Sequence, residues 1–250
     1  MKINNRFFKK NKKIYLSDIL KKLGKKNVSK NTYIENINDL NFAKKNDISF
    51  FNSLKYLESL KKSKSKFIIT HKKYESIVKQ YSKPILVENV LKAVSQITEL
   101  YYPDSLNDAI EFDLKIPNKK KYKNVKFGNN VLVGNNVIIG KDTIIGHNTI
   151  IESNVIIGTN CIIGNNVLIK YSKIGKNVRI LDSTIIGKKG FGFFPDQSKN
   201  IRYPHIGLVI IEDNVEVGCN NTIDRGSLSN TVIGTNTFID NQVHIAHNVN

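Results

Sequence analysis

The chain has 250 residues, of which 40% are hydrophobic, so it is a globular protein large enough for two domains. Its formal net charge of +18 is interpreted either as the mark of an acidic partner or as a compositional bias toward lysine. No recognition helix, zinc-finger spacing or aromatic RNA-binding signature accompanies that charge, so we expect no nucleic-acid binding. The apolar run at residues 14–16 is far too short for a signal peptide or a membrane span. We therefore expect no transmembrane segment and a cytoplasmic location.

Residues 1–107 are predicted to form a small α+β domain. Apolar residues recur at helical spacing over residues 16–23, with Ser17 placed to cap the helix and Gly24 to end it. Further strands are predicted at residues 47–51, 66–70 and 84–87, and a second helix at residues 90–101.

A linker at residues 108–124, rich in lysine, leads into a six-residue repeat that fills residues 125–250. The first column of the repeat consists of Val125, Val131, Val137, Thr143, Thr149, Val155, Cys161 and Val167. The second column, two residues later, consists of Phe127, Val133, Ile139, Ile145, Ile151, Ile157, Ile163 and Ile169. Residues i and i+2 share one face of a strand, so both columns are expected to point inward. The period predicts a solenoid of short parallel strands, the hexapeptide β-helix.

A glycine, usually followed by asparagine, stands at the corner after most of these strands. Both residues tolerate left-handed backbone, so we expect the corner to be left-handed.

The repeat is interrupted in three places. It runs one residue early from Ser172, and it stops after Gly187 for an excursion at residues 188–208. A shorter loop follows at residues 225–230. Loops on a rigid scaffold often carry function, so we expect the site there.

Three strings in this part of the chain are distinctive. They are Gly-Phe-Gly-Phe at 190–193, Thr-Ile-Asp-Arg-Gly at 222–226 and Ile-Asp-Asn-Gln-Val-His-Ile-Ala-His-Asn-Val at 239–249. With the order of domains, they resemble the UDP-3-O-(3-hydroxyacyl)glucosamine N-acyltransferases of lipid A biosynthesis. The resemblance spans nearly the whole chain and implies an α+β N-terminal domain followed by a left-handed parallel β-helix. The family continues with more coils and a helical tail, so the β-helix at 125–250 is expected to be incomplete.

The resemblance makes His247 the general base. Acyl transfer to a sugar amine needs a group that accepts the amine proton, and histidine titrates in the right range. The neighbouring Asp240, Asn241 and Gln242 are expected to orient the imidazole or the substrate.

The resemblance also assigns substrate contacts. The N-terminal domain would hold the uridine end, and its aromatic, amide and hydroxyl positions fall on Phe50, Asn52 or Ser53, and Tyr56. Because Phe50 and Phe51 alternate along a strand, one of them must be core. Phe191 and Phe193 would either shape the acyl and pantetheine path or plug the loop.

The other histidines are weaker candidates for the site. His71 and His147 are expected at the surface, and His244 is expected to point outward. His205 lies in the loop and is expected to be solvated there, with contact to the substrate as the alternative.

The resulting hypothesis is an enzyme that transfers a 3-hydroxyacyl chain from acyl carrier protein to the 2-amine of UDP-3-O-acyl-glucosamine. It would act as a homotrimer without metal or cofactor, the donor being carried on the phosphopantetheine of the carrier. The alternatives are a related sugar O- or N-acetyltransferase, a zinc β-helical carbonic anhydrase and a non-catalytic repeat scaffold. Cys161 and Cys219 are expected to be small buried side chains rather than a disulfide or a metal pair.

Overall fold

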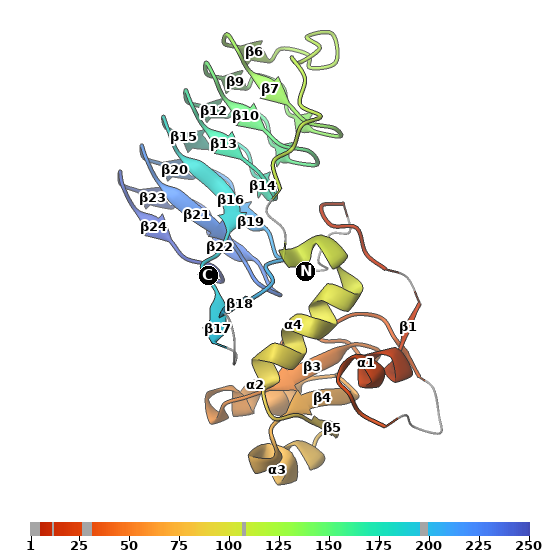
Figure 1. The fold of residues 1–250 in the computed structure, drawn as a ribbon. Helices are drawn as coiled ribbons and strands as arrows, with labels where there is room; N and C mark the ends of the chain where they lie inside the picture. Colours follow the sequence, from red (N-terminus) through yellow and green to blue (C-terminus); the bar gives the residue numbers. More distant parts are fainter. Residues whose placement is uncertain (1–5, 12, 27–31, 107–108, 196–199) are drawn as a thin grey trace. The chain divides into compact units, whose positions relative to one another are not determined.

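The structure, a computed structural model, describes residues 6–11, 13–26, 32–106, 109–195 and 200–250. The chain forms two compact units (Figure 1). The first comprises residues 1–107 and 192–204, and the second comprises residues 108–191 and 205–250. The predicted end of the first domain and start of the linker, residues 107 and 108, lie outside the described residues.

The first unit is built on a parallel sheet in the order β3-β4-β5. Its strands are β3 (Ile48–Phe51), β4 (Phe67–Thr70) and β5 (Lys83–Leu86). Its helices are α1 (Leu16–Lys22), α2 (Leu57–Lys62), α3 (Glu75–Lys79) and α4 (Val90–Tyr101), with short 3-10 turns at Leu54–Tyr56, Lys72–Tyr74 and Pro103–Leu106. Two antiparallel pairs complete it: β1 (Ile14–Tyr15) with β2 (Tyr33–Ile34), and β17 (Phe193–Pro195) with β18 (Asn200–Arg202).

These elements confirm the α+β prediction, including the strands at 47–51, 66–70 and 84–87 and the helix at 90–101. The core joins Phe51 to apolar residues of β4, α2 and α3, so Phe51 is the buried member of the Phe50–Phe51 pair. The predicted cap of the first helix is wrong. The N-cap is Tyr15, whose backbone N–H donates to Asp18, because the helix already begins at Leu16.

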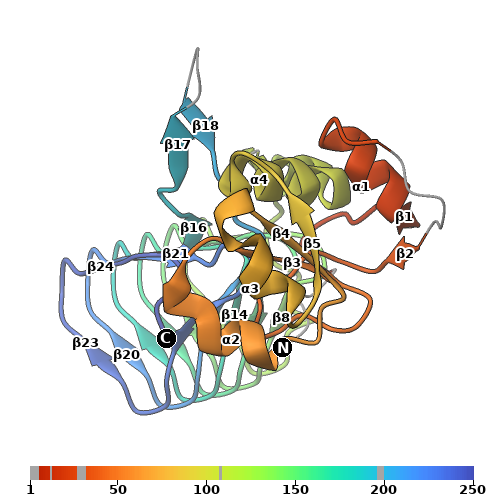
Figure 2. The ribbon, with the colours of Figure 1, turned by 90° about the horizontal axis from the view of Figure 1, so that it is seen from below.

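The second unit is a left-handed parallel β-helix with three faces, as predicted (Figure 2). The β7 face consists of β7 (Leu132–Val133), β10 (Ile150–Ile151), β13 (Leu168–Ile169), β16 (Ile185–Lys189), β21 (Thr222–Arg225) and β24 (His244–Ile245). The β8 face consists of β8 (Ile138–Ile139), β11 (Ile156–Ile157), β14 (Ser172–Ile174), β19 (Val209–Ile211) and β22 (Thr231–Ile233). The β6 face consists of β6 (Lys126–Phe127), β9 (Ile144–Ile145), β12 (Ile162–Ile163), β15 (Arg179–Ile180), β20 (Glu216–Val217) and β23 (Phe238–Ile239).

Both hexad columns point inward, as expected, and from Val131 to Ile169 every member is buried. Stacked strands pair at an interval of one coil, for example Ile145 with Ile163. After the deletion near Tyr171 the interval shortens by one residue, so that Ile157 pairs with Ile174. The coil therefore absorbs the deletion without losing its inward register.

The corner glycines and asparagines have different roles, which corrects the prediction. In most coils the left-handed residue is the one just before the first inward residue of the hexad, such as Asn130 (φ 57°) and Asn148 (φ 55°). Gly128 and Gly140 are instead required by close stacking. A Cβ on Gly140 would lie 2.5 Å from the backbone of Gly158 in the next coil. Glycine is needed there because neighbouring coils leave no room for a side chain.

All interruptions of the repeat fall at one corner, between the β7 and β8 faces. We call it the irregular corner. Its successive connections are 134–137, 152–155, 170–171, 190–208, 226–230 and 246–248. Extra residues at a corner leave the stacked strands of the walls intact. One edge of the β-helix thus collects every loop.

Candidate functional site

The last connections of the irregular corner bring distant residues together. The long excursion contributes Gly190 and His205, the next loop contributes Ser227 and Ser229, and the connection after β24 contributes His247. Stacking places them in adjacent coils, which is why a linear reading does not reveal their contacts.

His247 is fixed by its neighbour Asn248. The Nδ1 atom of His247 lies 2.8 Å from Oδ1 of Asn248. The same oxygen accepts the backbone N–H of Ser227 at 3.0 Å, while Nδ2 of Asn248 donates to the carbonyl of Ser229 at 3.3 Å. A backbone N–H only donates and a carbonyl only accepts, so these two bonds fix which end of the amide faces His247.

That orientation sets the tautomer of the imidazole. Since Asn248 presents an oxygen, Nδ1 of His247 must carry the hydrogen. In the neutral ring Nε2 then holds the lone pair. The neutral form of this half-buried histidine therefore has an unprotonated Nε2, the atom that would accept a proton.

His205 packs directly against this imidazole. Its ring meets that of His247 edge to face, with centroids 4.7 Å apart and an interplanar angle of 76°. It is fully buried, so the expectation of a solvated loop residue is wrong. Gly190 packs against both histidines: a Cβ there would lie 2.6 Å from Nε2 of His205 and 2.9 Å from Cβ of His247.

Arg225 anchors the long connection at 190–208 to the β-helix. The side chain is fully buried, with Nε donating to the carbonyl of His205 at 3.0 Å and Nη1 to that of Gly187 at 3.1 Å. Its guanidinium carbon lies 4.1 Å from the ring centroid of Tyr171. A planar cation that both donates and stacks suits this place. It fixes the backbone that carries His205.

A charged cluster lies on the β7 face beside these loops. Asp224, whose side chain is 1% exposed, pairs with Nζ of Lys188 at 2.9 Å and with Nε2 of His244 at 3.2 Å. The expected outward orientation of His244 is confirmed by its 54% exposed side chain. No local pattern in the sequence distinguishes Asp224 or Lys188 as a site residue. The only signal was the Thr-Ile-Asp-Arg-Gly string.

The residues predicted to support His247 lie at a different corner. Asn241 accepts the backbone N–H of Cys219 at 2.6 Å, and Asp240 accepts the N–H of Asn241 at 2.7 Å. Gln242 is the left-handed residue of that corner, with φ 58°. The side chain bonded to His247 is therefore Asn248, the next residue of the matched string.

The two phenylalanines of the excursion fall in different units. Phe191 belongs to the second unit and is exposed, while Phe193 lies on β17 in the first unit and is also exposed. Their proposed part in the acyl path stays a prediction.

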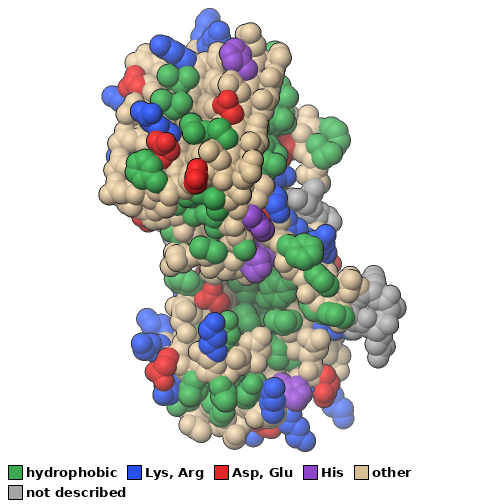
Figure 3. Space-filling view, turned by 90° about the vertical axis from the view of Figure 1, so that its left-hand side faces the viewer, with side chains coloured by type: hydrophobic (Ala, Val, Ile, Leu, Met, Phe, Trp, Pro, Cys, Tyr) green, Lys and Arg blue, Asp and Glu red, His purple; other side chains and the backbone are tan. Residues whose placement is uncertain are grey.

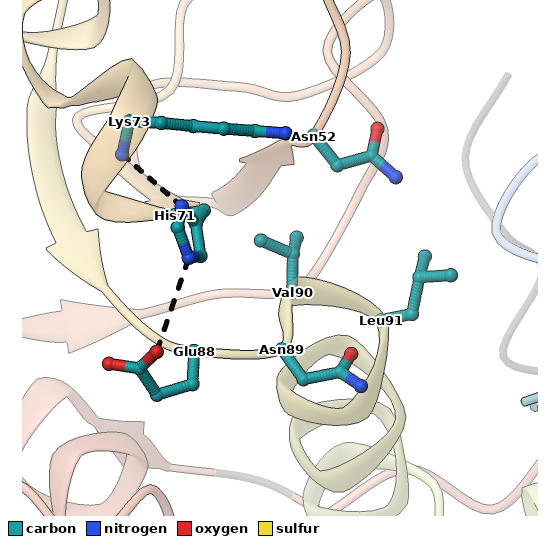
Figure 4. A pocket seen from close by; sticks show the side chains of 7 residues that line it. All are labelled: Asn52, His71, Lys73, Glu88, Asn89, Val90 and Leu91. Carbon is teal, nitrogen blue, oxygen red and sulfur yellow. Dashed lines mark hydrogen bonds and ion pairs between the residues drawn. The ribbon is translucent and has the colours of Figure 1, made fainter. Parts of the chain in front are cut away.

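The first unit has an open pocket of about 220 Å³ (Figure 4). It lies where β3, β4 and β5 end and α4 begins, the usual ligand position of a parallel sheet. Its lining residues are Asn52, His71, Lys73, Glu88, Asn89, Val90 and Leu91. Nδ1 of His71 accepts the N–H of Lys73 at 3.2 Å, and Nε2 lies 4.0 Å from Glu88 (Figure 4).

Of the residues predicted to hold uridine, Asn52 lines this pocket. Ser53 caps the following turn by accepting the N–H of Lys55 at 3.3 Å. Phe50 is half-buried on β3, and Tyr56 is 46% exposed at the end of that turn. Their roles remain predictions.

Within the described ranges, no three or more His, Cys, Asp or Glu side chains are grouped so as to hold a metal ion. Both cysteines are free thiols; Cys161 is buried, as expected, whereas Cys219 is only half-buried. Among the helices of the described residues, none has the length and apolar character that crossing a membrane requires.

Residues 31–100 match the family described as UDP-3-O-(3-hydroxymyristoyl) glucosamine N-acyltransferase, LpxD. Residues 136–171 match the bacterial transferase hexapeptide repeat. The resemblance stated from the sequence is thereby confirmed for residues 31–100, and the hexapeptide repeat is confirmed for residues 136–171.

Two solved acyltransferases align with about half of this chain. UDP-N-acetylglucosamine acyltransferase from Campylobacter jejuni is 25% identical over 50% of this chain and 44% of its own, with a TM-score of 0.26. AntD, an N-acyltransferase from Bacillus cereus, is 21% identical over 52% of this chain and 77% of its own, with a TM-score of 0.29. The first alignment thus spans less than half of the Campylobacter protein.

Proposed function

We propose that this chain is an N-acyltransferase of lipid A biosynthesis. It would transfer a 3-hydroxyacyl chain from acyl carrier protein to the 2-amine of UDP-3-O-acyl-glucosamine. The observation that most supports this proposal is the hydrogen bond between Asn248 and His247, which leaves Nε2 of His247 as a base beside the loops of the irregular corner. The family match over residues 31–100 supports the proposed substrate class.

The chemistry follows from that base. The amine nitrogen of the sugar attacks the thioester carbonyl carbon, and Nε2 of His247 accepts the amine proton. The carbon–sulfur bond of the tetrahedral intermediate then breaks, and the imidazolium returns the proton to the leaving thiolate. The products are an amide and the free thiol of the carrier. Asn248 contributes by accepting the Nδ1 hydrogen in both protonation states, which keeps Nε2 as the atom that gains and returns the proton.

The pocket of the first unit is our candidate for the uridine end of the acceptor. It offers the Asn52 amide, the amide of Asn89 and the charged heads of Lys73 and Glu88. A pyrimidine needs donors and acceptors on its edge and an aromatic or apolar surface on its face. Phe50 and Tyr56 precede and follow Asn52 and are proposed to supply that surface.

The partners are proposed on the same basis. Acyl carrier protein would be the donor, the phosphopantetheine arm would belong to the carrier, and the enzyme itself would need no metal or cofactor. The +18 charge suits an acidic partner. On the face in Figure 3, however, lysine and arginine are spread among apolar and polar side chains and form no single patch. We also propose a homotrimer in the cytoplasm.

One experiment separates this function from its rivals. Purified protein is incubated with UDP-3-O-acyl-glucosamine and 3-hydroxyacyl carrier protein, and the product is examined by mass spectrometry. We expect the mass of one added hydroxyacyl group, resistant to mild base as an amide is. Transfer from acetyl-CoA alone, or acylation of a hydroxyl, would favour a related acetyl- or O-acyltransferase. No transfer, with carbon dioxide hydration that depends on added zinc, would favour a carbonic anhydrase.

A further inference from the structure

The longest connection of the irregular corner carries a fully buried polar ring. His205 is 0% exposed. Burying an imidazole removes its ring nitrogens from water, which costs free energy that other contacts must offset. The proposed acyl transfer uses His247 as its base and gives His205 no part in the proton transfer. A buried histidine that packs against the proposed base therefore calls for a role of its own.

The segment that carries His205 is fixed by residues of the next coil. Nε of Arg225 donates to the carbonyl of His205 at 3.0 Å. The carbonyl of Ser227 accepts the two backbone N–H groups that follow, those of residues 206 and 207, each at 2.8 Å. The N–H of Ser227 itself donates to the side chain of Asn248 at 3.0 Å. Ser227 thus joins the segment of His205 to the amide that binds the proposed base, and so holds the two in fixed relative positions.

The ring of His247 has two neighbours that act on it in different directions. Oδ1 of Asn248 lies 2.8 Å from its Nδ1. The ring of His205 meets it edge to face, with centroids 4.7 Å apart and planes inclined by 76°. A hydrogen bond fixes one ring atom and leaves the ring able to swing about that atom. A second ring packed across it opposes this rotation, so the two contacts together set the orientation of the imidazole.

Gly190 shows which part of His205 makes the contact. A Cβ built on this glycine would lie 2.6 Å from Nε2 and 2.8 Å from Cδ2 of His205. It would also lie 2.9 Å from Cβ of His247. The outer edge of the His205 ring and the root of the His247 side chain therefore lie against the same point of the backbone. A residue that replaces His205 must reach this outer edge to keep the contact.

We propose that His205 is a positioning residue for the proposed acyl transfer. Its ring keeps the imidazole of His247 turned so that Nδ1 stays on Asn248 and Nε2 remains the atom that accepts the proton. His205 acts through His247 and contacts no reacting atom, because a fully buried ring offers no surface to the substrate. The inference rests on the proposed function, since it assigns what orients the base of that reaction.

The kinetic test uses two amide side chains that differ in reach. Glutamine extends as far as Nε2 of an imidazole, whereas asparagine is one methylene group shorter. We expect His205→Asn to lower kcat for N-acylation at least about tenfold, with KM for the UDP-sugar nearly unchanged, because the base is misplaced while acceptor binding is not. His205→Gln should keep kcat within about threefold of the unaltered protein. Equal losses in the two variants, or native kcat in both, would overturn the inference.

A matched control separates positioning from stability. Val137→Ala removes buried apolar volume from an early coil, where the side chain is 1% exposed, and should lower the melting temperature without changing kcat. Should His205→Asn not fold, His205→Met takes its place. Methionine fills the volume but has no planar group to oppose rotation of the His247 ring, so the same loss of kcat is expected.

Crystal structures of the unaltered protein and the variants give a readout that does not depend on activity. In His205→Asn we expect the ring of His247 to leave Asn248 while the backbone of residues 226–230 stays in place. In His205→Gln the hydrogen bond should be kept. A His247 ring that stays bonded to Asn248 in the asparagine variant would overturn the inference. If the unaltered protein transfers no acyl group, the proposed function is wrong, and the crystal structures alone then decide whether His205 positions His247.

Discussion

Nδ1 of His247 lies 2.8 Å from the side-chain oxygen of Asn248, and the amide of Asn248 is itself fixed by Ser227 and Ser229. The hydrogen on Nδ1 of His247 is therefore positioned by a loop of the preceding coil. Because the bonds to the backbone determine the amide orientation, the free lone pair of the neutral ring is on Nε2. This relationship turns a corner histidine into a candidate base.

Replacing His247 by alanine should lower kcat for N-acylation at least about a hundredfold and leave acceptor binding nearly unchanged, as expected for a lost general base. Steady-state kinetics and calorimetry with the UDP-sugar measure the two quantities. His147→Ala is the control, since that histidine is an exposed corner residue in an early coil. Near-native turnover of the His247 variant would remove this residue from the mechanism.

Replacing Asn248 by alanine should lower kcat at least about tenfold, because His247 loses the partner that sets its tautomer. The change also removes the acceptor of the Ser227 hydroxyl and the donor to the Ser229 hydroxyl. Thermal unfolding must therefore be measured in parallel. Asn248→Asp keeps the acceptor oxygen and should recover a large part of the lost kcat. If both variants lose only stability and retain native kcat, Asn248 does not position the base.

Gly190→Ala should reduce activity and stability together. The added methyl group would lie 2.6 Å from His205 and 2.9 Å from His247, so one of the rings or the backbone must move. We expect a loss of about 1–3 kcal/mol in the free energy of unfolding and at least about tenfold in kcat. Gly234→Ala is the matched control, because nothing lies within 4 Å of a Cβ at that corner. Equal behaviour of the two variants would contradict the close packing at Gly190.

Tyr56→Ala should weaken binding of the UDP-sugar by about 1–2 kcal/mol, the scale of one aromatic or polar contact in a partly buried site. Tyr56 is 46% exposed, so the stability of the fold should hardly change. Titration calorimetry measures the affinity. Unchanged affinity would mean that the nucleotide does not contact this residue.

The two cysteines should differ in reactivity. Burial raises the pKa of the Cys161 thiol, which is fully buried in an inward column, and so keeps it protonated and unreactive at neutral pH. Cys219 is only half-buried at its corner. A thiol reagent at pH 7.5 should label Cys219 first and Cys161 only on unfolding. Equal rates of labelling in the native protein would contradict the packing of that coil.

The sequence alone determined the architecture of both units. Period six is a local property: inward columns, strand length and corner spacing repeat in each hexad, so Val131 and Ile163 can be assigned to the core without knowing which coil lies beside which. The same holds for α4, whose apolar spacing and Asn89 cap are contained within one segment. The matched string also singled out His247.

Only the tertiary structure decided what surrounds that histidine. Ser227 contacts Asn248 across 21 positions of sequence, and Arg225 contacts His205 across 20. Those pairings depend on how the deletion near Tyr171 and the two loops shift the stacking of coils, which no local pattern encodes. The roles of the corner glycines were missed for the same reason, since Gly140 is required by the backbone of Gly158 in the next coil. Periodicity fixes what a residue does within its own turn, whereas contacts between turns exist only after the coils have stacked.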